Sequence, residues 1–333
     1  MPQKSVGIVL LTYNGMRLQY NGEGIINRCL RYLAKTDYDN FHVVVVDNGS
    51  EDNSIEIIKK YKVDLISIKE NLYNFSIVNN RGIKYLKSKY NPDYYVLISN
   101  DVFTTDKNWL KELVKVSESD KRIGVIGPKL LWPNKTIQSA GVYGGAATFN
   151  RWRGEKDNKK YNIVDEMPVI LGACIMIRKE VFDKIGLLDD NYAMGSEEVD
   201  LCLRAAAADF KIVYDGNAQA IHLERFTQKR RGKSVSFDLR RFYYAKRNFV
   251  YHTKKHFWSY GASDKAKALF DTYFGSFLTI DQSKRGMAKL FSIRKDKPVS
   301  NAMPLLKATV DGLLMNSKLK PAKRVKISDK NLW

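Results

Sequence analysis

The sequence predicts an α/β fold with an open, mostly parallel β-sheet flanked by helices. In the first hundred residues, short apolar runs rich in β-branched residues alternate with segments whose apolar residues recur at helical spacing. The runs are unbroken, which is typical of strands buried on both faces of a parallel sheet. Several runs end in polar clusters, and open α/β sheets bind ligands at the carboxyl ends of their strands.

The first elements alternate regularly along the chain. Apolar runs predict strands at residues 6–11, 41–46, 63–68 and 94–98. Helical patterns between them predict helices at residues 25–33, 55–61 and 77–90. This βαβαβαβ order indicates a sheet whose strands are joined by crossover helices.

The middle of the chain is less regular. It contains a Gly/Ala-rich stretch at 141–147 and a basic polar loop at 151–162. We expect strands at 123–131 and 169–178, a helix at 199–208, and two further strand pieces at 210–214 and 218–222. Ser196 is the expected N-cap of that helix, since serine is favoured at this position.

From residue 237 the chain becomes aromatic and basic. Amphipathic helices are predicted at 237–256 and in the shorter apolar pieces 268–280, 287–293 and 303–315. We therefore expect two domains, a body at 1–235 and a basic helical C-terminal region at 236–333.

The composition excludes several classes of protein. The chain has 333 residues and is 44% hydrophobic, so it can form a packed core and is not fully disordered. No window approaches the ~18 continuous apolar residues of a membrane-spanning helix. The apolar run at 6–11 is too short for a signal peptide, so we expect a cytoplasmic protein. Cys29, Cys174 and Cys202 have no metal-ligand spacing, and we expect buried thiols.

The net charge of +20 is unevenly distributed. Residues 1–224 contain 30 Lys and Arg against 29 Asp and Glu, whereas residues 225–333 contain 26 against 7. The basic C-terminal region implies an anionic partner: nucleic acid, acidic lipid or a phosphorylated substrate.

Three polar clusters follow predicted strands and are expected to meet at one edge of the sheet: Thr12-Tyr13-Asn14, Asp47-Asn48-Gly49-Ser50 and Asn100-Asp101. Asp101 offers a carboxylate for Mg²⁺ or Mn²⁺, which prefer oxygen ligands. Asp47 can accept a hydrogen bond from a nucleotide base. Asparagine and aspartate are also ordinary turn residues, which is the alternative interpretation of these clusters.

Three carboxylates lie within four residues at Glu197, Glu198 and Asp200. Like charges this close raise one another's pKa when they are buried, which suits a general base. A solvated helix N-terminus also favours acidic residues, so a structural role is the alternative. His222 ends an apolar strand pattern and is either a metal ligand, a base or an ordinary structural histidine. No glycine-rich dinucleotide motif or phosphate loop follows the first strand.

These motifs, in this order, resemble the family 2 glycosyltransferases and their rhamnosyltransferase-like branch. The matching stretches are VGIVLLTYN (6–14), VVVVDNGSEDNS (43–54), NLYNFSIVNNRGI (71–83), YVLISNDV (95–102), IGPKL (126–130), TIQSAG (136–141), LGACIMIRKEVFDKIGLLDD (171–190), SEEVDLCLR (196–204), IHLE (221–224) and YYAKRN (243–248). The resemblance covers about residues 1–250.

The resemblance implies a GT-A fold, a nucleotide-sugar donor, a divalent cation (Mg²⁺ or Mn²⁺) and inversion at the anomeric carbon. It assigns nucleotide-sugar binding to Thr12, Tyr13, Asn14, Asp47, Asn80 and Asn100. It assigns metal binding to Asp101 and His222, and the catalytic base to Glu198, with Glu197 or Asp200 as alternatives.

The sequence departs from the family pattern at three places. The metal motif reads Ser99-Asn100-Asp101, with a single acidic residue. The base position holds Glu198, which is one methylene longer than the usual aspartate. Asn74 stands where the family usually has glycine.

We therefore expect an inverting glycosyltransferase of surface polysaccharide synthesis that moves rhamnose or another hexose from a dTDP- or UDP-sugar to a glycan or polyprenyl-diphosphate-linked acceptor. The C-terminal region is expected to dock on the anionic inner face of the cell membrane, with Arg240, Arg241, Lys246 and Arg247 near the acceptor diphosphate. The alternatives are a non-enzymatic nucleic-acid-binding protein, which leaves the strand-end clusters unexplained, and a sugar nucleotidyltransferase. We expect no nucleic-acid partner.

Overall fold

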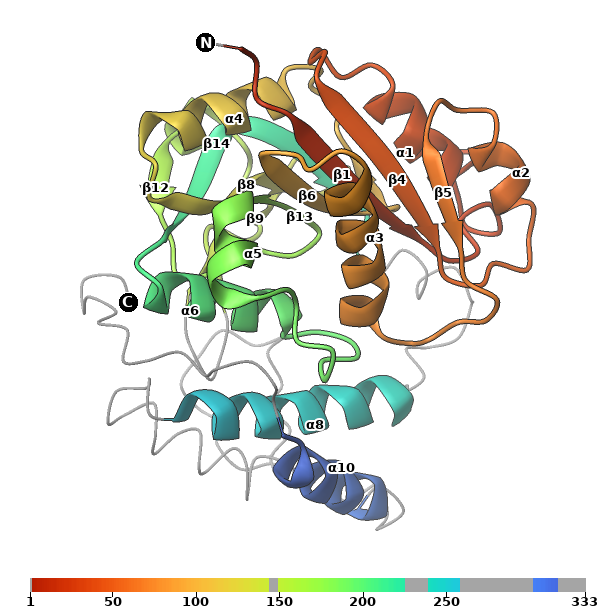
Figure 1. Cartoon of the computed structure of the whole chain (residues 1–333), viewed down its shortest axis with the longest axis vertical. Helices are drawn as coiled ribbons and strands as arrows, with labels where there is room; N and C mark the ends of the chain where they lie inside the picture. The colour runs from red at the N-terminus through yellow and green to blue at the C-terminus, as the bar shows by residue number, and fades with distance from the viewer. Residues whose placement is uncertain (1, 144–148, 225–238, 258–301, 317–333) are drawn as a thin grey trace.

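The computed structural model describes residues 2–143, 149–224, 239–257 and 302–316 (Figure 1). Within these residues the main sheet has ten strands. Its first half contains β5 (Asp64–Ser67), β4 (Phe41–Asp47), β1 (Val6–Thr12) and β6 (Tyr94–Ser99) in that spatial order, all parallel. These are the four strands predicted from the apolar runs, each matched to within a residue or two at its ends.

The second half of the sheet is mixed. β13 (Cys174–Arg178) lies between β6 and β8 (Ile123–Leu131) and is antiparallel to both. β14 (Lys211–His222) is parallel to β8, and β12 (Val164–Glu166) closes the edge in the antiparallel direction. The short strands β7 (Val102–Phe103) and β9 (Ile137–Ser139) pair with β14 and β8. The predicted strand 169–178 is shorter than expected, since its first five residues are not in β13.

The predicted strand pieces 210–214 and 218–222 are one continuous strand, β14. The register shifts between Asp215 and Gln219, which is a bulge of the kind that glycine and asparagine accommodate. A Cβ at Gly216 would lie 2.0 Å from the carbonyl oxygen of Tyr161, so the close backbone contact requires glycine there. The turn-like residues Gly216 and Asn217 therefore mark an irregularity within the strand.

Helices cover both faces of the sheet (Figure 1). Val9 and Leu11 belong to one core cluster and Ile8 and Leu10 to the other, as expected for a strand buried on both faces. The helices of the body are α1 (Ile25–Leu33), α2 (Ser54–Ile58), α3 (Phe75–Lys89), α4 (Trp109–Ser119), α5 (Lys179–Ile185) and α6 (Glu197–Ala207). α4 and α5 were not among the predicted elements. The remaining short elements are β2 (Gln19–Tyr20), β3 (Glu23–Gly24), β10 (Val142–Tyr143), β11 (Phe149–Asn150) and a 3₁₀ turn (Lys159–Tyr161).

Two helices of the C-terminal region are described, α8 (Leu239–His256) and α10 (Ala302–Leu314), and they correspond to predicted segments 237–256 and 303–315. They pack on each other below the body (Figure 1), where a Cβ at Gly312 would lie 2.6 Å from the carbonyl oxygen of Arg247. The predicted segments 268–280 and 287–293, and the expected boundary at 235, lie outside the described residues. Of the helices that the structure describes, none has the length and apolar content to cross a membrane.

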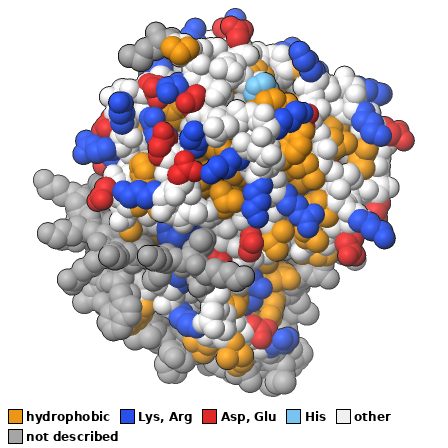
Figure 2. Space-filling model, in the orientation of Figure 1, with side chains coloured by type: hydrophobic (Ala, Val, Ile, Leu, Met, Phe, Trp, Pro, Cys, Tyr) orange, Lys and Arg blue, Asp and Glu red, His pale blue; other side chains and the backbone are white. Residues whose placement is uncertain are grey.

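The visible face of the body shows acidic and basic side chains side by side (Figure 2), in keeping with the near-neutral charge of residues 1–224. All three cysteines are buried and unpaired, as predicted.

Candidate active site

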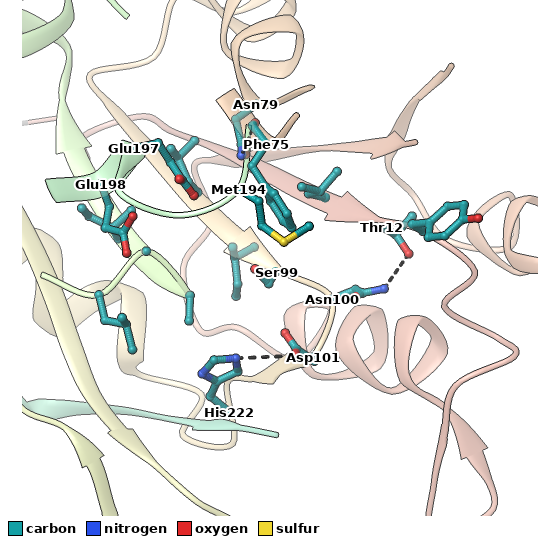
Figure 3. Close-up of a pocket in the computed structure, with 18 of the residues that line it drawn as sticks. Thr12, Phe75, Asn79, Ser99, Asn100, Asp101, Met194, Glu197, Glu198 and His222 are labelled. Atoms are coloured by element: carbon teal, nitrogen blue, oxygen red, sulfur yellow. Dashed lines mark hydrogen bonds and ion pairs between the residues drawn. The ribbon is translucent and has the colours of Figure 1, made fainter. Parts of the chain in front are cut away.

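A cavity of about 560 Å³ opens at the carboxyl ends of β1 and β6. Figure 3 shows its main side chains. Seven of the residues to which the resemblance assigns a site role line it: Thr12, Tyr13, Asn100, Asp101, Glu197, Glu198 and His222. They come from strand ends, from the start of α6 and from the end of β14, so the fold joins segments more than two hundred residues apart.

The first and third polar clusters meet directly at this edge. Asn100 donates a hydrogen bond from Nδ2 to Oγ1 of Thr12 at 2.7 Å (Figure 3). Thr12 is buried, whereas Tyr13 is 36% exposed at the cavity wall. This arrangement leaves an aromatic ring and polar groups available to a planar, polar ligand.

In the middle cluster Asn48 lines the cavity, whereas Asp47, Gly49 and Ser50 lie behind its wall. Asp47 is completely buried, and its carboxylate accepts hydrogen bonds from the backbone N–H and the hydroxyl of Ser50. The hydroxyl oxygen of Ser50 accepts from the backbone N–H of Asn14 at 2.8 Å. Asn14 and Asp47 are not among the cavity-lining residues, and their described contacts join the loops after β1 and β4.

Asn80 also lies outside the cavity wall. Its Nδ2 donates to the carbonyl of Leu188 and to Oδ1 of Asp190, at 2.8 and 2.7 Å. These bonds fix α3 to the loop before α6. Asn74 plays a related part, because it is the N-cap of α3 and accepts a hydrogen bond from the backbone N–H of Ile77.

Asp101 and His222 face each other across the cavity floor (Figure 3). Nε2 of His222 lies 3.5 Å from Oδ2 of Asp101. Imidazole nitrogen and carboxylate oxygen are ligands that suit Mn²⁺.

Within the described part of the chain, no group of three or more His, Cys, Asp or Glu side chains is arranged to hold a metal ion. Asp101 and His222 fit a site with two protein ligands whose other positions are filled by water or by substrate oxygens.

Glu197 and Glu198 begin α6 at the opposite wall (Figure 3). One carboxylate oxygen of each, Oε2, is buried without a hydrogen-bond partner among the described residues. Burial and the charge of Glu198 raise the pKa of Glu197 to about 8. Burial also raises the pKa of Glu198, although backbone N–H groups of Glu198 and Gly172 partly offset it. A pair of this kind retains a proton at neutral pH, which is a property of acid–base residues.

Ser196 is the N-cap residue of α6, but its side chain makes no capping hydrogen bond. Its backbone is left-handed, with φ of 75°, after Gly195 with φ of 86°. This turn directs the first residues of α6 toward the cavity.

Asp200 is completely buried and does not line the cavity. It forms ion pairs with Arg204 and Lys255 at 2.7 and 2.6 Å, and Nε2 of His256 lies 2.7 Å from its Oδ1. Burial opposes ionisation, yet the charges of Arg204 and Lys255 and the hydrogen bond with His256 hold the pKa of Asp200 well below its usual value. Asp200 therefore has its hydrogen-bonding capacity occupied by structural contacts, unlike Glu197 and Glu198.

The residues expected to contact the acceptor lie on α8. Arg247 donates to the carbonyl of Asn191 at 2.7 Å, so it contacts the loop before α6. Lys246 lies over the ring of Phe249 at 5.9 Å. The side chains of Arg240 and Arg241 lie outside the described set.

Three residues in or beside the cavity were missed as site residues although they lie in motifs quoted above or in the basic loop. Glu224 and Arg153 line the cavity and form an ion pair at 2.9 Å. Gln138, from the TIQSAG stretch, contacts both His222 and Glu224. Their positions in those motifs could have marked them as candidate site residues. The sequence alone does not show that the three residues contact one another.

Comparison with known proteins agrees with this geometry. The model of the family "Glycosyl transferase family 2" matches residues 8–186. Two solved structures show the fold: a mannosyltransferase from Pyrobaculum calidifontis in complex with GDP-Man and Mn²⁺, and GalNAc-T7 with UDP, GalNAc and Mn²⁺. The first has a TM-score of 0.54 and 13% identity, covering 93% of this chain and 74% of that one. The second has a TM-score of 0.58 and 14% identity, covering 81% and 51%.

The fold and the cavity at its strand ends thus define a GT-A-like protein. The chain belongs to glycosyl transferase family 2. It is similar to the O-antigen biosynthesis protein RfbC of Myxococcus xanthus, with 27% identity over 218 residues, 59% of this chain and 16% of that protein. It is also similar to the N-acetylglucosaminyl-diphospho-decaprenol L-rhamnosyltransferase of Mycobacterium tuberculosis, with 24% identity over 220 residues, 59% of this chain and 71% of that protein. The chain spans only a small part of the length of RfbC.

Proposed function

We propose that this chain is an inverting glycosyltransferase that moves a hexose or rhamnose from a nucleotide-sugar donor to a glycan or lipid-linked acceptor during cell-surface polysaccharide synthesis. The main support is the arrangement of the cavity. It has a half-buried carboxyl pair opposite Asp101 and His222, at the strand edge where α/β sheets bind nucleotides. Family membership and the names of the two relatives also support sugar transfer in polysaccharide synthesis.

Glu198 is the proposed general base. Its carboxylate takes the proton from an acceptor hydroxyl as that oxygen forms a bond to the anomeric carbon. The bond from that carbon to the nucleoside diphosphate breaks on the opposite face, so the anomeric configuration inverts. Glu197, whose pKa is raised to about 8, retains its proton at neutral pH, and Glu198 is proposed to be the ionised member of the pair.

Asp101 and His222 are the proposed residues that hold a divalent cation, Mg²⁺ or Mn²⁺. When bound, such a cation neutralises negative charge on the diphosphate leaving group. Thr12, Tyr13 and Asn100 are proposed to line the nucleotide subsite. We propose a supporting role for Asn14, Asp47 and Asn80. They do not line the nucleotide subsite, but their hydrogen bonds hold the loops that form it.

The C-terminal helices are the proposed contact with an anionic membrane and its lipid-linked acceptor. Val310, Leu313 and Leu314 on α10 are 44%, 40% and 72% exposed. Exposed apolar side chains beside basic residues are typical of helices that lie on a membrane surface. Lys246 and Arg247, with Arg240 and Arg241, are proposed to lie near the acceptor diphosphate.

A ligand panel tests the proposal. Thermal unfolding would be measured with UDP-, dTDP- and GDP-sugars in the presence of Mn²⁺ or Mg²⁺. A donor at 100 times its dissociation constant stabilises the folded state by roughly 2.7 kcal/mol. We expect a UDP- or dTDP-sugar to raise the melting temperature, and release of the nucleoside diphosphate once an acceptor is added. No response to any pyrimidine nucleotide would contradict the proposal.

A further inference from the structure

Gln138 is a completely buried polar residue beside the cavity that has no part in the function proposed above. It lies on β9, and its amide group is placed between His222 and Glu224. Its Oε1 is 2.8 Å from Nδ1 of His222. Its Nε2 donates to Oε2 of Glu224 at 2.9 Å.

Glu224 determines which way this amide points. Its Oε2 also accepts hydrogen bonds from Trp132 Nε1 at 3.2 Å and Arg153 Nη2 at 2.9 Å. A carboxylate oxygen among N–H donors can only accept. The NH₂ group of Gln138 must therefore face Glu224, and its carbonyl oxygen must face His222.

The amide in turn determines where His222 has its hydrogen. An amide oxygen can only accept, so Nδ1 of His222 must be the protonated nitrogen. In a neutral imidazole the lone pair is then on Nε2. That nitrogen faces Oδ2 of Asp101 at 3.5 Å (Figure 3). Two electron-rich atoms thus face each other, as two ligands of one cation do.

We propose that Gln138 is a positioning residue that holds His222 in the Nδ1–H tautomer, with Glu224 fixing the orientation of the Gln138 amide. The role of this tautomer rests on the proposed function, because the unprotonated Nε2 is then available to bind the divalent cation. The tautomer itself does not depend on that function. Hydrogen-bonded neighbours of metal-binding histidines commonly act in this way.

The first experiment determines the tautomer without any metal. The chain has only four histidines, so the ¹⁵N chemical shifts of the ring nitrogens can be assigned, with His222→Ala identifying the His222 signals. The spectra are recorded at a pH above which the ring signals no longer change, so that the neutral imidazole is observed. We expect the Nδ1–H form in the unaltered protein and its loss in Gln138→Met. The Nε2–H form in the unaltered protein would overturn the proposal without the need for a folded variant.

The second experiment measures Mn²⁺ binding by electron paramagnetic resonance, with UDP or dTDP present. Loss of such a neighbour typically weakens metal affinity by about 10–100-fold, and we expect this for Gln138→Met. Ser139→Ala is the matched control on the same strand, and its affinity should be unchanged. Equal affinities in the Gln138→Met and unaltered proteins would overturn the proposal. If the unaltered protein shows the Nδ1–H tautomer but binds no Mn²⁺, the metal role in the proposed function fails instead.

Discussion

Lys255 of α8 places its ammonium group 2.6 Å from Oδ1 of Asp200 on α6, and both side chains are almost completely buried. Lys255 also contacts Oδ2 of Asp189 at 2.7 Å. The C-terminal region is therefore joined to the helix that begins with Glu197 and Glu198 by buried ion pairs. These pairs fix α8 beside the candidate active site.

Replacing this lysine should destabilise the protein strongly. Lys255→Met leaves Asp189 and Asp200 with less compensating charge in the interior, which typically costs about 3–5 kcal/mol. Chemical denaturation would measure the loss. The control is Lys307→Met, which removes an exposed pair with Asp311 and should change the free energy of unfolding by less than about 1 kcal/mol. Equal stability of the two variants would contradict the prediction.

The Glu198→Gln protein should bind donor normally but transfer sugar poorly. Loss of a general base lowers kcat by about 10²–10⁴-fold. Single-turnover assays and nucleotide binding would be measured in parallel. Glu197→Gln is the matched control on the same helix, and it should retain most activity because glutamine resembles the protonated Glu197. A larger loss in Glu197→Gln than in Glu198→Gln would assign the base to Glu197.

Folding stability should fall as the pH rises from about 4.5 to about 8. The pKa of Glu197 is raised from 4.5 to about 8 in the folded protein, so the folded state binds more protons than the unfolded state in this window. The contribution of this group is complete below pH 4.5 and is lost as the pH passes through 8. Glu197→Gln should flatten this part of the stability profile, measured by urea unfolding at several pH values. An identical slope in both proteins would refute the assignment.

Gly172 should be needed for the position of Glu198. A Cβ at residue 172 would lie 3.1 Å from Cβ and 3.3 Å from Cγ of Glu198, so the Glu198 side chain must shift by a few tenths of an ångström in Gly172→Ala. Misplacing a catalytic group by up to 1 Å can cost roughly 100-fold, and we expect about a tenfold lower kcat with donor affinity retained. Full activity in a protein of unchanged melting temperature would count against this role of Gly172.

The exposed face of α10 should bind anionic vesicles. Leu313→Glu combined with Leu314→Glu places negative charge on this apolar face and should abolish flotation with vesicles containing acidic lipid. Ile163→Glu combined with Val164→Glu alters two exposed apolar residues of the body, at 38% and 48% exposure, and should leave flotation unchanged. Flotation of the first variant at the unaltered level would exclude α10 as the contact.

The parts of the fold that the sequence predicted are those determined by local pattern. The strand at 123–131 has the predicted bounds because nine consecutive buried residues form it. Thr12, Asn100 and Asp101 were found because strand ends of a parallel sheet share one edge. By contrast, a single-residue cap such as Asn74 and the bulge at Gly216 depend on contacts with Asp190 and Tyr161, far away in the chain.

The same reason limits prediction of the candidate site. Glu197, Glu198 and Asp200 look equivalent in the sequence, and only the buried partners Arg204 and Lys255 distinguish Asp200. Gln138 is one polar residue in a short motif until β14 places His222 beside it. Such roles depend on which distant segments meet, and no local spacing records that.

The reversed direction of β13 has a consequence for how this chain can change in evolution. β8 ends at Leu131 and β13 begins at Cys174, and both points lie at the cavity edge because the two strands are antiparallel. The intervening segment leaves and re-enters the sheet on the same side, and it contributes the short strands β9 and β12 to that sheet. Insertions or deletions between these strands therefore change the rim of the cavity while the pairing of β8 with β13 is kept. Related chains that act on different acceptors should differ in length mainly there, while the β1–β6 half stays constant.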